Sequence, residues 1–331
     1  MLQDFQGICR YTTSEKITGI EFERQNLLLA NIRPYLKKVW FADFSGAAST
    51  DVLVLKATTI VPGFLKYIIA NESFISHVMS AVKGSKMPRG DKSHILNYTL
   101  GMPCHDEQQK IADFLSLVDE RIEKQRQLVE VLKRYKRGYF QQIILGLDTK
   151  DFEVADVVKE YTEKTQTQNE YPILSSTLSG IQLQNSYFNK QAASENTVGY
   201  KIVPYGYFTY RSMSDTGDFR FNLQTIIDKG IVSPAYPVFS ILDDHESEFV
   251  EYILNETDKI KNQLHIIKEG GTRYALSFAK FKSLTISLPT KQQQENFVNQ
   301  LRLFNKLLSR EETIYIDLQK HKSALLQQMF I

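Results

Sequence analysis

The residues of this sequence best suited to chemistry are basic side chains that stand among aromatic and amide side chains. Guanidinium and ammonium groups contact phosphate oxygens, and guanidinium and amide groups also form hydrogen bonds with the edges of bases. On this pattern we predict DNA contacts at six positions, which are Arg33, Lys37, Lys38, Arg211, Arg220 and Arg273. Each group also has a plainer interpretation, because clusters of charge commonly cover a solvated surface.

Motifs for catalysis and metal binding are absent from the sequence. Gly84-Ser85-Lys86 lacks the upstream spacing of a phosphate-binding loop. The six histidines are scattered, and we interpret His94 and His105 as surface or capping residues. Cys9 and Cys104 form neither a metal-ligand spacing nor a disulfide framework. We therefore expect no catalytic residue, no metal site and no cofactor in this chain.

Length and composition indicate more than one folded domain. The chain has 331 residues, of which 42% are hydrophobic, and a formal net charge of only +2. A nucleic-acid surface would therefore depend on local clusters of charge and not on the overall balance. The N-terminal residues form no signal peptide, and no segment is long enough to cross a membrane. We expect a cytoplasmic protein with reduced cysteines.

A long-range internal repeat is the most informative feature. A shift of 186 residues aligns Gly84–Leu145 with Gly270–Ile331 without a gap. The identical pairs include Gly84/Gly270, Thr99/Thr285, Pro103/Pro289, Gln108/Gln294, Leu115/Leu301 and Leu132/Leu318. Chance similarity between two amphipathic helices is the alternative, but it does not explain the matching glycine and proline. The repeat indicates that one unit, a domain followed by a helix, occurs twice.

Each copy ends in a long amphipathic pattern. Apolar residues recur in steps of four and three over more than four heptads, which is typical of helices that pack together. We predict that the two helices pack antiparallel through Leu115, Ile122, Leu132, Leu301, Leu308 and Leu318. Asp106 with Gln109, and Thr290 with Gln293, have the pattern of a capping box. The helices would serve either as a rigid spacer between two domains or only for dimerisation.

The regions outside the helices contain short apolar and aromatic runs that are typical of strands. Leu96–Met102 and Leu284–Leu288 are predicted to be the last strand before each helix. We predict an α+β fold with two β-rich domains, residues 1–105 and 147–289, and two long helices, residues 106–146 and 290–331. The first domain is shorter at its N-terminus by about 33 residues, which is enough for one or two strands.

Several segments resemble the specificity subunits of type I restriction–modification systems, and the resemblance covers nearly the whole chain. At the start of each long helix the matching segments are Pro103–Gln108 and Pro289–Gln294. At its end they are Tyr139–Ile143 and Leu325–Phe330. Tyr171–Thr177 and Asn31–Trp40 resemble recurring segments of target recognition domains. The chain departs from the family at its N-terminus, where the first recognition domain starts late.

The resemblance implies a DNA-binding subunit that serves in phage defence and is not an enzyme by itself. In this family each target recognition domain reads one half of a bipartite double-stranded DNA site. The helices set the spacing between the half-sites and dock two modification subunits. These subunits bind S-adenosylmethionine and methylate adenine, and restriction subunits that use ATP and Mg²⁺ join some complexes. The chain itself is expected to bind no cofactor and no membrane.

Two other functions stay open at this point. The shortened first domain fits a scaffold protein that binds the modification subunit, or dimerises through its helices, and reads at most one half-site. An enzyme acting alone, either a methyltransferase or a nuclease, would need a site assembled from distant residues.

Overall fold

The structure is a computed structural model that describes residues 19–84, 87–184, 196–267 and 273–330. The chain divides into two compact units. Unit 1 comprises Met1–Leu132 and Leu308–Ile331, and unit 2 comprises Lys133–Leu307. Each long helix therefore contributes to both units. Cys9 lies outside the described residues.

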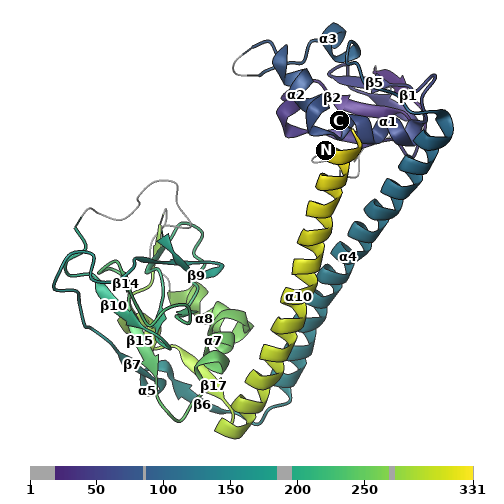
Figure 1. Cartoon of the computed structure of the whole chain (residues 1–331). Coiled ribbons are helices and arrows are strands. Elements are labelled where there is room, and N and C mark those ends of the chain that lie inside the picture. Colours follow the sequence, from purple (N-terminus) through teal and green to yellow (C-terminus); the bar gives the residue numbers. More distant parts are fainter. Residues whose placement is uncertain (1–18, 85–86, 185–195, 268–272, 331) are drawn as a thin grey trace. The chain divides into compact units, whose positions relative to one another are not determined.

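The described residues of unit 1 form five strands, one short 3-10 helix and three short α-helices ahead of a long helix (Figure 1). Its elements are β1 (Ile20–Phe22), β2 (Leu27–Ala30), η1 (Pro34–Leu36), β3 (Val39–Phe41), β4 (Gly46–Ala48), β5 (Val52–Leu55), α1 (Pro62–Ile69), α2 (Glu72–Ser80), α3 (Lys92–Leu96) and the start of α4 (His105–Leu145). β3, β2 and β5 form an antiparallel sheet in that order, and β1 pairs with β4. Leu27 and Leu29 of β2 are buried in one core with residues of α1 and α2, and Leu28 is buried in a second cluster with Trp40.

Unit 2 has the same kinds of element with additional strands (Figure 1). Its strands are β6 (Lys150–Glu153), β7 (Val158–Glu160), β8 (Leu174–Thr177), β9 (Gly180–Leu183), β10 (Lys201–Pro204), β11 (Phe208–Thr209), β12 (Met213–Ser214), β13 (Asn222–Leu223), β14 (Lys229–Val232), β15 (Val238–Ile241), β16 (Tyr274–Ala275) and β17 (Thr285–Leu288). Its helices are α5 (Val154–Val157), α7 (Ser247–Glu256), α8 (Asp258–Ile267), α9 (Phe278–Lys282) and the start of α10 (Lys291–Met329). The main sheet has the order β13-β11-β15-β7.

The repeat predicted from the sequence is present in the topology. The sheet β3-β2-β5 corresponds to β13-β11-β15, and the pair β1-β4 corresponds to β10-β14. Helices α3 and α9 are equal in length and begin 186 residues apart, with Asp91 and Ser277 as their N-caps. The side chain of each cap accepts hydrogen bonds from backbone N–H groups of the first turn, which would otherwise have no partner.

A buried glutamine repeats in both copies with the same bonds. Gln108 accepts a hydrogen bond from the backbone N–H of Val61 and donates one to the carbonyl of Pro103. Gln294 accepts from the backbone N–H of Glu246 and donates to the carbonyl of Pro289. Each glutamine therefore joins the start of a long helix to the residue that precedes a shorter helix, which is α1 in unit 1 and α7 in unit 2.

Gln294→Ala is expected to lower the free energy of unfolding of unit 2 by about 1–3 kcal/mol, because it leaves a buried N–H and a buried carbonyl without partners. Chemical denaturation of the purified protein measures this change. Gln293→Ala is the control, since the neighbouring Gln293 caps the helix from a more exposed position. An equal loss in both variants would contradict the role assigned to the buried amide.

The long helices are α4, with 41 residues, and α10, with 39 residues. In unit 1, Lys322 Nζ lies 2.5 Å from Asp119 Oδ1, and Gln125 Nε2 donates to Glu311 Oε2 over 2.7 Å. In unit 2, Lys136 Nζ donates to Asn305 Oδ1 over 2.6 Å, and Tyr139 bonds Gln300. From the first of these contacts to the last, the residue numbers rise along α4 and fall along α10. The two helices are therefore antiparallel within each unit.

The start of α4 differs from the sequence prediction. Thr290 and Gln293 form the predicted capping contact, because the backbone N–H of Thr290 donates to Gln293 Oε1 over 3.2 Å. Asp106 and Gln109 do not form the other one, since α4 begins at His105. The backbone N–H of Cys104 instead donates to Glu107 Oε2 over 3.3 Å. Cys104 is the residue equivalent to Thr290, and its thiol is too weak an acceptor to complete a capping box.

The strand predicted at Leu96–Met102 is also wrong. Its counterpart β17 forms because it pairs with β6, from Thr285↔Glu153 to Leu288↔Lys150. Among the described residues, unit 1 has no counterpart of β6, β7, β8 or β9. Within the part of unit 1 that the structure describes, the segment at Leu96–Met102 therefore has no neighbouring strand to complete its backbone hydrogen bonds. For the same reason β5 is an edge strand in the described part of unit 1, whereas its counterpart β15 is flanked by β11 and β7.

Candidate nucleic-acid interface

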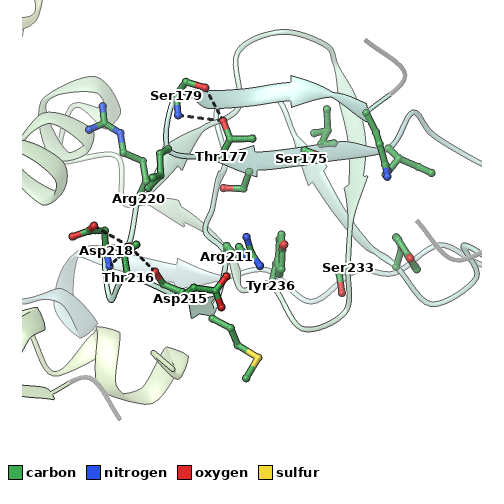
Figure 2. Close-up of a pocket in the computed structure, with 18 residues that line it drawn as sticks. Ser175, Thr177, Ser179, Arg211, Asp215, Thr216, Asp218, Arg220, Ser233 and Tyr236 are labelled. Carbon is green, nitrogen blue, oxygen red and sulfur yellow. Dashed lines mark hydrogen bonds between the residues drawn. The ribbon is translucent and has the colours of Figure 1, made fainter. Parts of the chain in front are cut away.

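A polar groove on unit 2 is the main candidate for a binding site. Its volume is about 1020 Å³, and hydroxyl, amide, carboxylate and guanidinium groups all contribute to its lining. One wall is the hairpin β8–β9, and the other is the loop from Arg211 to Arg220 (Figure 2). Ser233 and Tyr236, which follow β14, complete the lining. This mixture of donors and acceptors suits hydrogen bonding to a polar ligand more than burial of an apolar one.

The first wall is fixed by the alternation of residues in β8. Leu174 and Ser176 are buried, whereas Ser175 and Thr177 are partly exposed along the groove. Leu174 packs in a core cluster with residues of β10, β14 and β15. A Cβ atom at Gly230 would lie 2.5 Å from the side chain of Leu174, so only glycine lets β14 approach this closely. The hydroxyl groups of the hairpin are therefore held at a fixed position.

The second wall is a loop stabilised by its own polar contacts. Arg273 Nε lies 2.8 Å from Asp215 Oδ1, and Thr216 Oγ1 donates to Asp218 Oδ2 over 2.9 Å. The hydrogen bond and the charge of Arg273 hold the pKa of the Asp215 carboxyl below its ordinary value. Gly217 has φ 81°, a left-handed conformation that glycine adopts without strain. The loop therefore presents the ionised Asp215 carboxylate to the groove.

The three arginines predicted in unit 2 have different surroundings. Arg211 and Arg220 line the groove. Arg220 is paired with Glu256 over 2.9 Å, and Arg273 is paired with Asp215. Arg211 is exposed and forms no hydrogen bond or ion pair with the residues that the structure describes, although its charge is close enough to Asp215 to help lower the pKa of that carboxyl. Only Arg211 therefore offers an unpaired guanidinium to this groove within the described part of unit 2.

The three basic residues predicted in unit 1 surround one short turn. Arg33 and Lys37 flank η1 on either side, with φ 52° and 48°. Left-handed backbone at two non-glycine residues is unfavourable and is commonly found at functional sites. Lys37 forms an ion pair with Glu72, and Lys38 also has an interaction partner. Arg89, which the sequence analysis did not select, bridges to Ile32 and lies 3.1 Å from Asp51.

The histidines of unit 1 form a structural contact. The rings of His77 and His94 stack with their centres 4.0 Å apart, and each ring nitrogen Nε2 lies within hydrogen-bond distance of the other residue's carbonyl. No group of three His, Cys, Asp or Glu residues in the described ranges is arranged to hold a metal ion. His94 thus has a packing role in unit 1.

Sequence reasoning missed most of the groove. Asp215 and Asp218 lie in one loop and Tyr236 in another, and they gave no signal because only folding brings the two loops together. The segment Tyr171–Thr177 was selected by its resemblance to recognition domains, and part of it lines the groove. That motif was the one available pointer to the hairpin wall.

The residues predicted at the helix interface are buried or half-buried. Leu115, Ile122 and Leu301 are buried, and Leu132, Leu308 and Leu318 are half-buried. Leu115 packs in unit 1 with residues of α1 and with Leu326, and Leu301 packs in unit 2. Leu117 and Leu303 are equivalent in the two copies, yet they are 65% and 70% exposed. Large exposed leucines at matching positions form a second candidate surface.

Comparison with known proteins finds a family model that matches part of the chain. Residues 9–134 match the model of the type I restriction modification DNA specificity domain. No protein matches in a search of curated proteins. In none of the described helices is there a stretch that meets the length and hydropathy needed to span a membrane.

Two solved structures share the fold over most of the chain. One is a chain from a type I restriction–modification system studied for complex assembly and conformational transition, with 15% identity and a TM-score of 0.61. It is matched over 93% of this chain and 82% of its own. The other is the specificity subunit of a type I system from M. genitalium, with 13% identity, a TM-score of 0.57, and coverage of 98% and 87%. The family model thus matches the first domain and most of α4, and the two solved structures show that the chain shares their fold over most of its length.

Proposed function

We propose that this chain is a DNA sequence-specificity subunit that reads a bipartite DNA site and docks modification subunits. The groove of unit 2 carries the first part of the proposal. It combines Arg211 with carboxylate and hydroxyl groups on two walls, and these are the groups that distinguish base edges in the major groove. A surface that contacted only phosphates would need cations and would gain nothing from Asp215 and Asp218.

The exposed leucines of the long helices carry the second part. Leu117 and Leu303 occupy the same position in the two copies of the repeat. Two equivalent surfaces suit two copies of the same partner. The partner we propose is the modification subunit, which would bind S-adenosylmethionine and flip the target adenine out of the duplex. ATP and Mg²⁺ would be bound by a restriction subunit where one joins the complex.

The decisive experiment is adenine-methylation sequencing of DNA from cells that express this chain with its modification subunit. Two short specified sequences separated by a fixed unread spacer are the expected motif. Omitting this chain should abolish the motif. The absence of any sequence preference in the complete complex would refute the proposal.

A single-half-site function has one observation in its favour. The described residues of unit 1 contain no counterpart of the β8–β9 hairpin that forms one wall of the groove in unit 2. A motif with only one specified half would show that unit 1 acts as a scaffold. Incubation of the isolated chain with DNA and labelled S-adenosylmethionine should transfer no methyl group. Transfer without a partner would instead support an enzyme.

Leu303→Asp is expected to weaken association with the modification subunit at least about tenfold, because it places a carboxylate in an apolar contact. Its thermal stability should equal that of the wild type, since the side chain is 70% exposed. Quantitative pull-down measures the association, and Lys306→Ala, which changes the charge by the same amount at a nearby exposed position of α10, controls for charge. Unchanged affinity in both Leu303→Asp and Leu117→Asp would exclude this docking surface.

A further inference from the structure

The three arginines near the groove of unit 2 are chemically distinct because their partners differ. The Arg220 guanidinium is engaged by Glu256, and Nη1 lies 2.9 Å from Oε1. The Arg273 guanidinium is engaged by Asp215. Arg211 lines the groove with no such partner in the described part of the unit. A ligand in the groove can therefore recruit Arg211 without first breaking an ion pair.

The residues on both sides of Arg211 are held by one residue, Leu276, through the side chain of Tyr210 and the backbone of Ser212. The hydroxyl of Tyr210 donates to the carbonyl of Leu276 over 3.2 Å, and the backbone N–H of Leu276 donates to the carbonyl of Ser212 over 2.9 Å. Tyr210 and Leu276 are fully buried. The Cα atom of Arg211 is thus fixed between two anchored neighbours while its side chain extends into the groove. Such an arrangement lowers the entropy lost when the side chain binds a ligand.

The charges around Arg211 favour a base edge over a phosphate. Asp215 and Asp218 line the same groove, and Figure 2 shows Asp215 and Arg211 on the wall opposite Ser175 and Thr177. A phosphate placed beside Arg211 would be repelled by these carboxylates. A guanine presents two neutral acceptors, O6 and N7, which match the two-pronged guanidinium. The cytosine paired with it presents an amino group, for which a carboxylate is the matching acceptor.

We propose that Arg211 determines specificity by reading one guanine of the half-site bound by unit 2, with the ion pair Asp215–Arg273 positioning the loop that carries the carboxylate acceptor. This assignment rests on the proposed function. Arg220 and Arg273, which we predicted as DNA contacts from the sequence, act in this arrangement by holding the groove in shape.

The test is a binding series with the assembled complex of this chain and its modification subunit. The probes are the duplex carrying the motif found by methylation sequencing and the duplexes with each G·C pair replaced in turn. In the wild type, replacing one particular G·C pair should weaken binding by about 5- to 150-fold. Arg211→Ala should remove the discrimination at that pair and leave it intact at the others. Arg211→Lys should retain part of it, because an ammonium contacts guanine through fewer bonds.

The control is Lys261→Ala, which removes one positive charge from an exposed position of α8 that does not line the groove. It should leave every preference unchanged. If Arg211→Ala instead weakens binding to all duplexes equally and reduces the salt dependence, Arg211 is a phosphate contact and the inference is overturned. An unaltered preference in Arg211→Ala overturns it as well. A wild-type complex without any motif would refute the proposed function itself, which is a separate outcome.

Loss of folding is distinguished from loss of specificity by the thermal unfolding of each variant. Because Arg211 is exposed and forms no hydrogen bond or ion pair with the described residues, Arg211→Ala should unfold at the wild-type temperature. Arg211→Gln provides a second folded variant of similar length. Gain of a preference for A·T at the same position in Arg211→Gln would support the assignment, since glutamine pairs with adenine.

Discussion

Leu115→Ala is expected to lower the free energy of unfolding of unit 1 by about 2–5 kcal/mol. Leu115 is fully buried on α4, where it packs with Phe64 and Tyr67 of α1 and with Leu326 of α10. Removing its side chain leaves a cavity bounded by three helices, and these helices cannot all move inward together. Urea denaturation monitored by circular dichroism measures the change.

The control for this variant lies two residues away. Leu117 is 65% exposed, so Leu117→Ala should change the free energy of unfolding by less than about 0.5 kcal/mol. Leu301→Ala, the equivalent change in unit 2, should destabilise that unit, with Leu303→Ala as its control. If Leu115→Ala and Leu117→Ala had equal effects, the packing of α4 in unit 1 would be other than described.

Asp119→Ala is expected to lower the free energy of unfolding of unit 1 by about 3 kcal/mol, because it leaves the two ammonium groups around the carboxylate without their partner. Lys66 Nζ lies 2.6 Å from Asp119 Oδ2, Lys322 Nζ lies 2.5 Å from Oδ1, and the Tyr67 hydroxyl donates to Oδ2. The three helices α1, α4 and α10 therefore meet at one carboxylate. Its side chain is 25% exposed, so water offsets part of the loss.

The matched control is Asn305, which occupies the equivalent position in the second copy. It accepts one hydrogen bond from Lys136 at an exposed site. Asn305→Ala should therefore cost no more than about 1 kcal/mol. If the two variants destabilise the protein equally, the cluster around Asp119 contributes no more than an exposed hydrogen bond.

The Asp119 cluster should also make stability depend on pH. Burial alone would raise the pKa of the Asp119 carboxyl, but the ammonium groups of Lys66 and Lys322 outweigh it and hold the pKa below its ordinary value. The stabilisation is therefore present above the pKa of the unfolded state, about 3.9, and is lost as pH falls toward the lower folded value. The stability difference between wild type and Asp119→Asn should shrink over this acidic range. A constant difference would contradict the assignment.

The sequence predicts the repeated parts of the fold well, because repetition and helical periodicity are local signals. Leu115 and Leu301 were placed at buried positions by their heptad spacing alone. The start of α4 was missed because Asp106 is a better capping residue by type than Cys104. The alignment of the two copies indicates the correct start of α4, because Cys104 aligns with Thr290, the residue before α10. The strand at Leu96–Met102 failed because a strand requires a partner, and the partner of β17 comes from a segment 130 or more residues earlier.

The candidate site is less predictable for a similar reason. Composition selected Arg211, Arg220 and Arg273 together, and no property of the sequence separates them. Their difference arises from Glu256 and Asp215, which lie 36 and 58 residues away from their partners. The conformation of the loops decides which guanidinium remains available to a ligand. That conformation depends on contacts between residues far apart in the sequence, and a single sequence does not reveal them. The hairpin β8–β9 was found only through a family resemblance.

The contact between Gln125 and Glu311 joins the same position of the two copies, since the residues are 186 apart. At this contact, equivalent residues of the two antiparallel helices therefore face each other. A dimer built from the first half alone would set an amide against an amide there, and each Lys136 would meet an Asp119. A dimer of the second half would oppose two carboxylates and give Lys322 only a neutral Asn305. In the single chain Glu311 faces Gln125 and not a second Glu311, so the acidic side chain is tolerated at this position. The two halves therefore match each other better than the second half matches itself.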